Sequence, residues 1–335
     1  MKQFSYRHNK ESELMTQMEA EEAVSMPEDE LFSFADFNAA DAEKTGLSNY
    51  SYWHSTIQAF LKKKGAVVLL VLLAVLLIFT FIQPYLPNQY DPNLIINDPG
   101  GMQYRNILPG ERFILGTNSI GQDLWARIWA GTRTSLLIGL SVALAEALIG
   151  ITVGVIWGYV RKVEILLTEV YNIIDNIPNT IILILVSYIL RPGVRTLIFA
   201  MCLTGWIQMA RFIRNQILII RDRDYNVASR CLGTPAVKII IKNLLPYLVS
   251  VIMLRMALTI PAAIGNEVFI TYIGLGLPVS TPSLGNLINE GRALITSAAL
   301  RYQLVYPTII VSFVTISFYM VGNAFADAAD PKNHV

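Results

Sequence analysis

The chain has 335 residues, of which 53% are hydrophobic and only 15% are charged. Soluble domains of this length carry about a quarter charged residues, so the composition argues against a soluble globular domain. The formal net charge of +1 gives no basis for nucleic-acid binding, and the isolated cysteines Cys202 and Cys231 indicate neither a disulfide nor a metal site.

The first 49 residues are strongly acidic. Eleven acidic residues lie in segment 1–49, against four basic ones: Lys2, Arg7, Lys10 and Lys44. A charged segment with few apolar anchors buries too little surface to fold, so we predict a disordered tail on the cytoplasmic side.

Residues 50–64 predict a short helix that lies in the membrane interface and leads into the first span. Aromatic and apolar side chains recur at helical spacing ahead of three lysines: Tyr52, Trp53, Ile57 and Phe60, then Lys62, Lys63 and Lys64. An ordinary polar linker is the alternative interpretation.

Six apolar segments follow within 65–327, each near the ~20 residues that cross ~30 Å of hydrocarbon as a helix. They are 66–82, 134–160, 165–190, 196–220, 246–273 and 303–326. Because barrel strands are only about half as long, these lengths predict an all-α, polytopic membrane protein with six transmembrane helices. The first segment lies too deep in the chain for a cleavable signal peptide.

Two features accompany the second apolar segment. Gly150, Gly154 and Gly158 are spaced four residues apart, a pattern that allows close helix packing. The proline-punctuated loop 83–133 precedes the span, and its end from Asp123 to Trp129 predicts a separate amphipathic helix at the interface.

The lysines predict the orientation in the membrane. They flank the predicted spans on one side only: Lys62, Lys63, Lys64, Lys162, Lys238, Lys242 and Lys332. The positive-inside rule therefore predicts that both ends of the chain, including the tail 328–335, are cytoplasmic. Loop 83–133 is then extracellular, and loop 221–245 is cytoplasmic.

The sequence offers no motif for catalysis. No glycine is followed by lysine, so the phosphate-binding loop GxxxxGK[ST] is absent, as are HExxH and GxSxG. The three histidines, His8, His54 and His334, all lie outside the predicted spans. We therefore expect neither an enzyme nor a cofactor or metal site in this chain.

The predicted cytoplasmic loop has a distinctive local pattern. Residues from Tyr225 to Leu232 favour a short helix, and Gly233 can end it in a left-handed cap. A second helix is predicted from Pro235, which suits a first-turn position. The result is a helix–glycine–helix elbow between two spans, a rigid protrusion suited to a partner's groove.

This elbow resembles the "EAA…G…LP" loop of permease subunits of ATP-binding-cassette (ABC) importers. Val227, Ala228 and Ser229 stand at the Glu-Ala-Ala positions, and Gly233 and Leu245-Pro246 stand at the glycine and Leu-Pro positions. The spacing is intact, but Val227 replaces the family's glutamate. We therefore expect docking to depend more on packing than on a salt bridge.

Other segments resemble the oligopeptide/dipeptide/nickel branch, specifically permeases of the OppC/DppC/AmiD type in Gram-positive bacteria. The matching segments are Leu115–Asp123, Ile273–Leu277, Thr281–Asn286, Glu290–Arg292, Gly322–Asp327 and Asp330–Lys332. The resemblance extends from about Tyr50 to Lys332.

The resemblance implies the type I ABC importer permease fold and a location in the bacterial cell membrane. It implies a second related permease subunit, two ATP-binding subunits that hold ATP and Mg, and an extracellular peptide-binding lipoprotein. This chain would then contact membrane lipid and the peptide substrate and form half of the pathway. The implied contacts to the ATPases are Tyr225, Asn226, Val227, Ala228, Ser229, Arg230, Leu232 and Gly233.

Five ionisable residues fall within the predicted spans: Glu146, Glu169, Asp175, Arg255 and Glu267. Intramembrane charge is costly, so each is expected to face protein or a water-filled path. They either line the peptide route or hold the helices together. Matched depths suggest that Asp175 pairs with Arg255, with Arg211 as the alternative partner.

Three alternatives to oligopeptide import remain open from the sequence. Dipeptide or nickel import is the alternative within the family. An ATPase-independent secondary transporter is expected to contain internal repeats, and we find none. An intramembrane enzyme needs convergent catalytic groups; Asp175 and Glu146 are an acid pair without a supporting motif.

Overall fold

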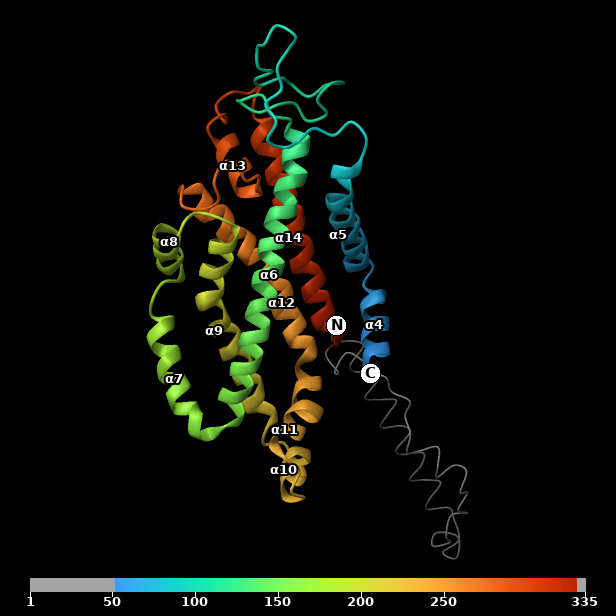
Figure 1. The fold of residues 1–335 in the computed structure, drawn as a ribbon. Helices are drawn as coiled ribbons and strands as arrows, with labels where there is room; N and C mark the ends of the chain where they lie inside the picture. Colours follow the sequence, from blue (N-terminus) through green and yellow to red (C-terminus); the bar gives the residue numbers. More distant parts are fainter. Residues whose placement is uncertain (1–51, 330–335) are drawn as a thin grey trace, which may run out of the picture. The chain divides into compact units, whose positions relative to one another are not determined.

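The computed structural model describes residues 52–329, and their regular structure is helical apart from two isolated bridges (Figure 1). The elements are α4 (Tyr52–Lys62), α5 (Lys64–Ile82), η1 (Gln83–Tyr85), α6 (Leu124–Tyr159), α7 (Arg161–Asp175), α8 (Asn179–Ile189), α9 (Val194–Ile220), α10 (Asp224–Cys231), α11 (Ala236–Ile239), η2 (Ile240–Leu244), α12 (Leu245–Tyr272), α13 (Leu284–Arg292) and α14 (Tyr302–Ala329). The predicted disordered tail 1–49 lies outside the described residues, as does most of the predicted tail 328–335.

Five helices are long and apolar enough to cross a membrane, namely α5, α6, α9, α12 and α14. α7 and α8 pass the same test together, but they are bent by 74° at the break between them. The described part of the chain therefore has six spans when the bent pair is counted as one.

The prediction of one continuous helix over 165–190 is wrong. α7 ends at Asp175, and α8 begins at Asn179, directly after Pro178. Proline has no N–H to donate to the preceding turn, and its ring disfavours a helical conformation for the residue before it, Ile177. The chain therefore changes direction at this proline.

The prediction of a separate helix from Asp123 to Trp129 is also wrong, because the residues after Asp123 form the first turns of α6. The Asp123 carboxylate caps this helix by accepting a hydrogen bond from the backbone N–H of Ala126 at 2.8 Å. Trp125 and Trp129 pack edge-on against Phe79 of α5, with ring centroids 5.9 and 4.7 Å away.

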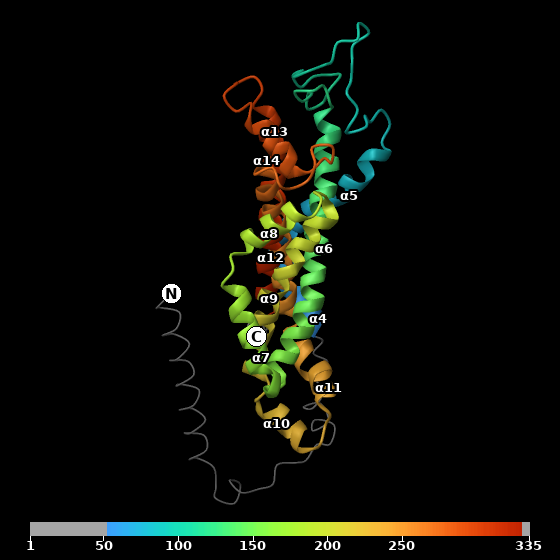
Figure 2. The ribbon, with the colours of Figure 1, turned by 60° about the vertical axis from the view of Figure 1, so that its left-hand side comes forward.

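α6 and α9 lie side by side along the bundle (Figures 1 and 2). The contact is closest at the glycines of α6. A Cβ atom added to Gly154 would lie 2.5 Å from the carbonyl oxygen of Ala210, and one added to Gly158 would lie 2.7 Å from Cβ of Ile217. The two helix backbones approach this closely because the glycines carry no side chain.

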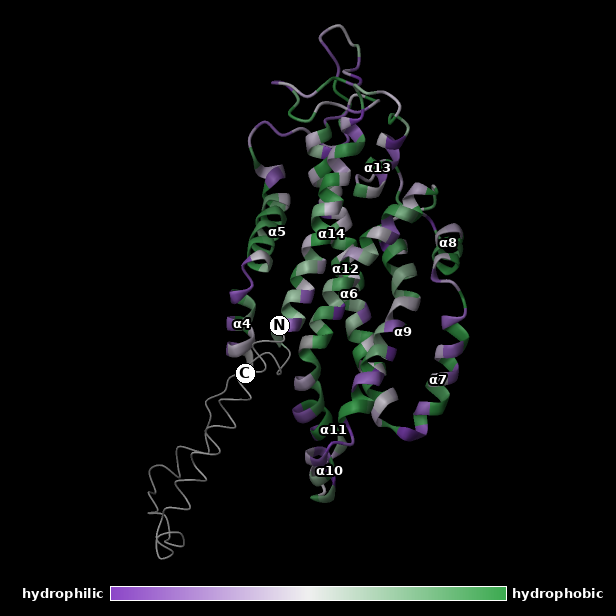
Figure 3. Cartoon of the chain, turned by 180° about the vertical axis from the view of Figure 1, so that it is seen from behind, coloured by the Kyte–Doolittle hydropathy of each residue, from purple (hydrophilic) through white to green (hydrophobic). Residues whose placement is uncertain are grey.

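The outward faces of the spans are apolar. Val68, Val75 and Ile78 of α5 and Leu144 and Leu148 of α6 are each more than half exposed. Figure 3 shows hydrophobic residues along α5 and α14, whereas hydrophilic residues interrupt α4 and α7. Such apolar outer faces suit lipid rather than water as the surrounding solvent.

Helix α4 lies in the segment for which an interfacial helix was predicted, and it packs on the end of α14. The rings of Phe60 and Phe325 lie 6.2 Å apart, and Nζ of Lys63, which follows α4, is 2.9 Å from Oδ2 of Asp327. These contacts fix the direction in which the chain enters the first span.

We expect Gly154→Ala to destabilise the protein by about 1–3 kcal/mol, because the new methyl group forces α6 and α9 apart. Thermal unfolding of the purified protein in detergent measures this effect. Gly265→Ala is the matched control, since a Cβ at Gly265 of α12 meets nothing within 4 Å. Equal melting temperatures for the two variants would contradict the packing argument.

Candidate functional site

The loop between α9 and α12 contains α10 and α11 and lies at one end of the bundle (Figure 1). α10 ends in a left-handed glycine, Gly233, with φ of +76°. The N–H of Gly233 donates to the carbonyl of Arg230, and that of Thr234 donates to the carbonyl of Ser229, both at 3.0 Å. These two bonds form a Schellman motif, which closes the helix and turns the chain toward α11.

A buried asparagine fixes α10 to the ends of its neighbours. Asn226 is fully buried, and its amide nitrogen donates to the carbonyl of Ile220 at the end of α9 at 2.8 Å. Its amide oxygen accepts from Asn243 of η2 at 3.0 Å. Because these bonds are buried, breaking them leaves polar groups without partners, and the loop is held stiffly.

The π-helical segment η2 joins α11 to α12, so the second helix of the elbow continues into the span. Pro246 lies in the first turn of α12 and has no N–H with which to continue the α-helical ladder. The wider π-helical turn of η2, directly before this proline, accommodates the missing backbone hydrogen bond.

The charged residues of the loop bind one another. Arg230 donates to Asp222 at 3.1 Å, and Arg221 donates to the same carboxylate at 3.2 Å. These hydrogen bonds, that from Arg230 foremost, hold the pKa of the Asp222 carboxyl below its usual range. Arg230 is thus engaged within the loop.

Several large apolar side chains of the loop are exposed, beside exposed charged residues such as Asp224 and Lys238. Tyr225, Val227 and Leu232 are 46, 39 and 85% exposed, and Val237 of α11 is 64% exposed. Ala228 is also exposed, while the hydroxyl of Ser229 turns back to the carbonyl of Tyr225 at 2.8 Å. The loop therefore presents exposed apolar side chains on a stiff frame beyond the end of the bundle.

The prediction that Asp175 pairs with Arg255 is wrong, and the alternative partner Arg211 is present instead, 3.8 Å away. Tyr171 hydrogen-bonds both Asp175 and Arg211, and Gln208 of α9 also donates to Asp175. Asp175 is at the end of α7, beside α9, and this places Arg211 within its reach.

A second ion pair between α7 and α9 was not identified from the sequence. Glu164 of α7 lies 2.6 Å from Arg214 of α9 and 3.9 Å from Arg221 just beyond it. The residue spacing could have revealed it. Arg211, Arg214 and Arg221 lie on one helical face, and Glu164 and Asp175 lie on one face of their own helix. Ion pairs thus hold the bent α7–α8 segment to α9.

Glu267 is fully buried and is enclosed by hydroxyl groups. Its carboxylate accepts hydrogen bonds from the hydroxyls of Ser135 in α6 at 3.0 Å and Thr271 in α12 at 3.2 Å. A Cβ on Gly285 of α13 would lie 2.6 Å from the same carboxylate. Glu267 therefore holds α6, α12 and the start of α13 together.

Another ion pair, between a buried arginine and a partly buried glutamate, joins α6 to α13, and it was also missed. Arg127 is 1% exposed and lies 2.7 Å from Glu290 of α13. Asn118 of the loop donates to Glu290 at 3.3 Å and to Gln122 at 2.9 Å. The sequence signal was weak, because Arg127 sits in a segment that predicted a surface helix.

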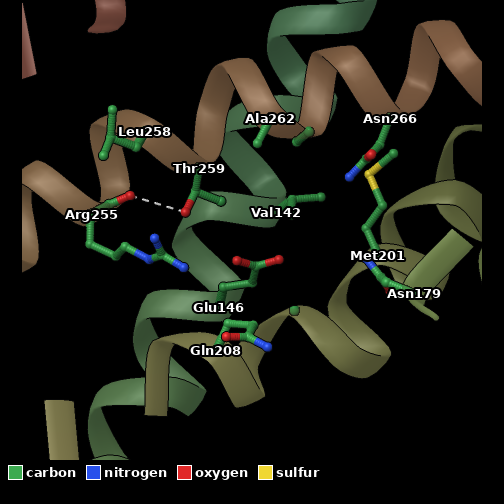
Figure 4. A pocket seen from close by; sticks show the side chains of 12 residues that line it. Val142, Glu146, Asn179, Met201, Gln208, Arg255, Leu258, Thr259, Ala262 and Asn266 are labelled. Atoms are coloured by element: carbon green, nitrogen blue, oxygen red, sulfur yellow. Dashed lines mark hydrogen bonds between the residues drawn. The ribbon is translucent and has the colours of Figure 1, made fainter. Parts of the chain in front are cut away.

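Glu146 and Arg255 face one cavity of about 190 Å³ within the spans (Figure 4). Its polar lining comes from α6, α8, α9 and α12, as Glu146, Asn179, Gln208, Arg255, Thr259 and Asn266. Asp175 lines a neighbouring cavity that shares Asn179, Gly205 and Gln208 with the first. Glu169 of α7 is exposed and lines neither.

Comparison with known proteins identifies the family. Residues 150–335 match the family described as "Binding-protein-dependent transport system inner membrane component". Residues 51–106 match the "N-terminal TM domain of oligopeptide transport permease C".

Curated relatives match over most of their length. The oligopeptide transport system permease protein AmiD of Streptococcus pneumoniae is 39% identical over 93% of this chain and 100% of that protein. The Bacillus subtilis oligopeptide permease OppC is 31% identical over 90% of this chain and 97% of its own length. The Bacillus subtilis dipeptide permease DppC is 31% identical over 91% and 93%.

These matches agree with the helical membrane fold, which is that of a type I importer permease, and with the loop that the sequence singled out. They favour a subunit of a binding-protein-dependent transport system over a secondary transporter. The chain belongs to the family of inner membrane components of binding-protein-dependent transport systems, and it is a multi-pass permease subunit of the ABC type.

Proposed function

We propose that this chain is one of two permease subunits of an ATP-driven oligopeptide importer, in which it forms half of the translocation pathway. The observation that carries this proposal is the stiff loop helix α10 with its exposed apolar face, in a chain 39% identical to an oligopeptide permease along that protein's whole length. Dipeptide import is the second candidate, supported by the 31% identity to DppC.

The loop acts as the lever that connects the spans to a nucleotide-binding partner. A lever transmits force only when it is stiff, and the Schellman motif at Gly233 and the buried bonds of Asn226 supply that stiffness. The apolar side chains of Tyr225, Val227 and Leu232 dock into the partner by packing. Arg230 contributes indirectly by holding Asp222.

ATP and Mg bind to two partner ATPases, and this chain has no ATP site of its own. A second, related permease completes the pathway, and an extracellular lipoprotein delivers the peptide. Isolation of the tagged chain from its membrane is expected to bring two ATPases and a second permease with it. Recovery of the chain without any ATPase would contradict the proposal.

Both ends of the chain lie in the cytoplasm of a bacterial cell, so the end of the bundle with α10 faces inward. We expect a membrane-impermeant maleimide to label Gly100→Cys on intact cells in a chain whose native cysteines are replaced by serine. A chain that keeps only Cys231, which is exposed in α10, should react only after permeabilisation. The opposite labelling pattern would reverse the orientation.

We expect Gly233→Val to uncouple ATP hydrolysis from transport, because a β-branched residue is strained at φ of +76°. Peptide uptake and ATPase activity are measured together in the reconstituted complex. Uptake should fall severalfold per ATP hydrolysed, while the subunit still assembles in the membrane.

Gly193→Val is the matched control for this variant. Gly193 precedes α9 at the opposite end of that helix from α10, its φ of 170° is ordinary extended backbone, and a Cβ there meets nothing within 4 Å. Uptake per ATP should therefore stay at the wild-type level. A Gly233→Val complex that behaves like this control would refute the assignment of α10 as the lever.

A further inference from the structure

Glu146 and Arg255 differ from Asp175 and Glu267, which have partners, and from Glu169, which lies outside the cavity. Asp175 has Arg211, and Glu267 has two hydroxyls. In the described residues 52–329, by contrast, neither the Glu146 carboxylate nor the Arg255 guanidinium has a hydrogen-bond or ion-pair partner. Both point into the same cavity (Figure 4). Charge inside a membrane is costly unless it is compensated. The opposite charges and the Phe212 ring, 5.9 Å from the Arg255 guanidinium, compensate it in part, but they leave the hydrogen-bonding capacity of both groups unused, which suits a polar ligand.

The backbone around Glu146 leaves room for its carboxylate. A Cβ on Gly205 of α9 would lie 1.7 Å from Oε1 of Glu146, so only glycine fits there with the carboxylate in this position. Glu146 lies roughly 20 Å from the end of α6 at 1.5 Å per residue, well inside the hydrocarbon. The Glu146 carboxylate therefore lies at the depth of the hydrocarbon and not at either membrane face.

The rest of the polar lining consists mainly of carboxamides. Asn179, Gln208 and Asn266 reach the cavity from α8, α9 and α12. A carboxamide has N–H groups that donate hydrogen bonds and a carbonyl oxygen that accepts them. These groups complement the C=O and N–H of a peptide bond. The same groups bind any amino-acid sequence, because every peptide has the same main chain.

Every unmodified linear peptide also carries an ammonium at one end and a carboxylate at the other, whatever its side chains. Each end must pass the middle of the membrane during import, where an uncompensated charge is most costly. The opposite charges that compensate these ends are a carboxylate and a guanidinium, and the cavity holds one of each.

We propose that the cavity is a passing site for the peptide main chain, in which Glu146 accepts hydrogen bonds from the N-terminal ammonium and Arg255 donates to the C-terminal carboxylate. The two ends of a longer peptide meet their partners in succession, and the carboxamides bind the amides between them. This inference rests on the proposed function of peptide import. It identifies the main chain and the two charged ends of the peptide as the features that this subunit binds.

The test uses the complete importer in proteoliposomes, with the binding lipoprotein saturated by one of three probes. These are pentaalanine, Nα-acetyl-pentaalanine and pentaalanine amide. Rates of a variant are divided by the wild-type rate for the same probe, so preferences of the binding lipoprotein cancel.

Glu146→Gln should slow uptake of pentaalanine and its amide about tenfold, the range expected for losing a hydrogen bond to a charged group. The acetylated probe, which has no ammonium, should be affected less than twofold. Arg255→Gln should give the converse pattern, sparing only the amide. Glu169→Gln is the matched control, since Glu169 lies on α7 outside the cavity, and it should alter no rate.

Equal losses for all three probes would show that the two residues only hold helices together, and unchanged rates would show that the peptide passes elsewhere. Either result overturns the passing site while leaving peptide import intact. A wild-type complex that imports none of the probes would overturn the proposed function and the passing site together.

A second measurement needs no substitution in the chain. Pentaalanine extended by a C-terminal benzoylphenylalanine should cross-link, during ATP-driven uptake by the wild-type complex, to segments that contain Val142, Met201 or Leu258 of the lining. Adducts confined to other segments would overturn the passing site even if a cavity variant fails to assemble.

Discussion

The close contact between α6 and α9 is the constraint on which the rest of the structure depends. Gly150, Gly154 and Gly158 allow the backbone of α9 to approach α6, and this contact sets the rotation of α9 about its own axis. One face of α9 is thereby directed toward α7, where Arg211 and Arg214 find carboxylates. Gly205 and Gln208 are directed toward the cavity that α9 shares with α6 and α12.

Two sets of charged groups in the bundle have different physical roles. Glu267 and Arg127 are fully buried and hydrogen-bonded, and they join α6 to α13 at the end of the bundle opposite α10. Groups of this kind stabilise one arrangement of helices, because separation would leave a buried charge without a partner. Glu146 and Arg255 instead face open space, and this suits groups that meet a succession of ligands.

The loop at the other end of the bundle shows how a short helix gains stiffness. α10 has only eight residues, too few to be stable alone in water. It is ordered by its glycine cap, by the bonds of Asn226 and by the charges around Asp222. The bonds of Asn226 lie inside the loop, whereas the charges around Asp222 are exposed beside the apolar side chains of Tyr225, Val227 and Leu232.

The sequence by itself determined the features that depend on local pattern. Apolar runs near twenty residues predicted the spans, glycines spaced four apart predicted close packing, and Gly233 marked the end of the loop helix. The bend at Pro178 was a local signal too, and it was underestimated because the apolar character of 165–190 continues across it.

Only the tertiary structure decided which charged groups meet. Depth along a helix follows from residue number, and matched depth left two candidate partners for Asp175, namely Arg255 and Arg211. The choice between them depends on how each helix is rotated, and rotation is set by packing between segments far apart in the chain. For the same reason the sequence did not predict that Glu146 and Arg255 face one cavity, or that Glu267 is enclosed by hydroxyls.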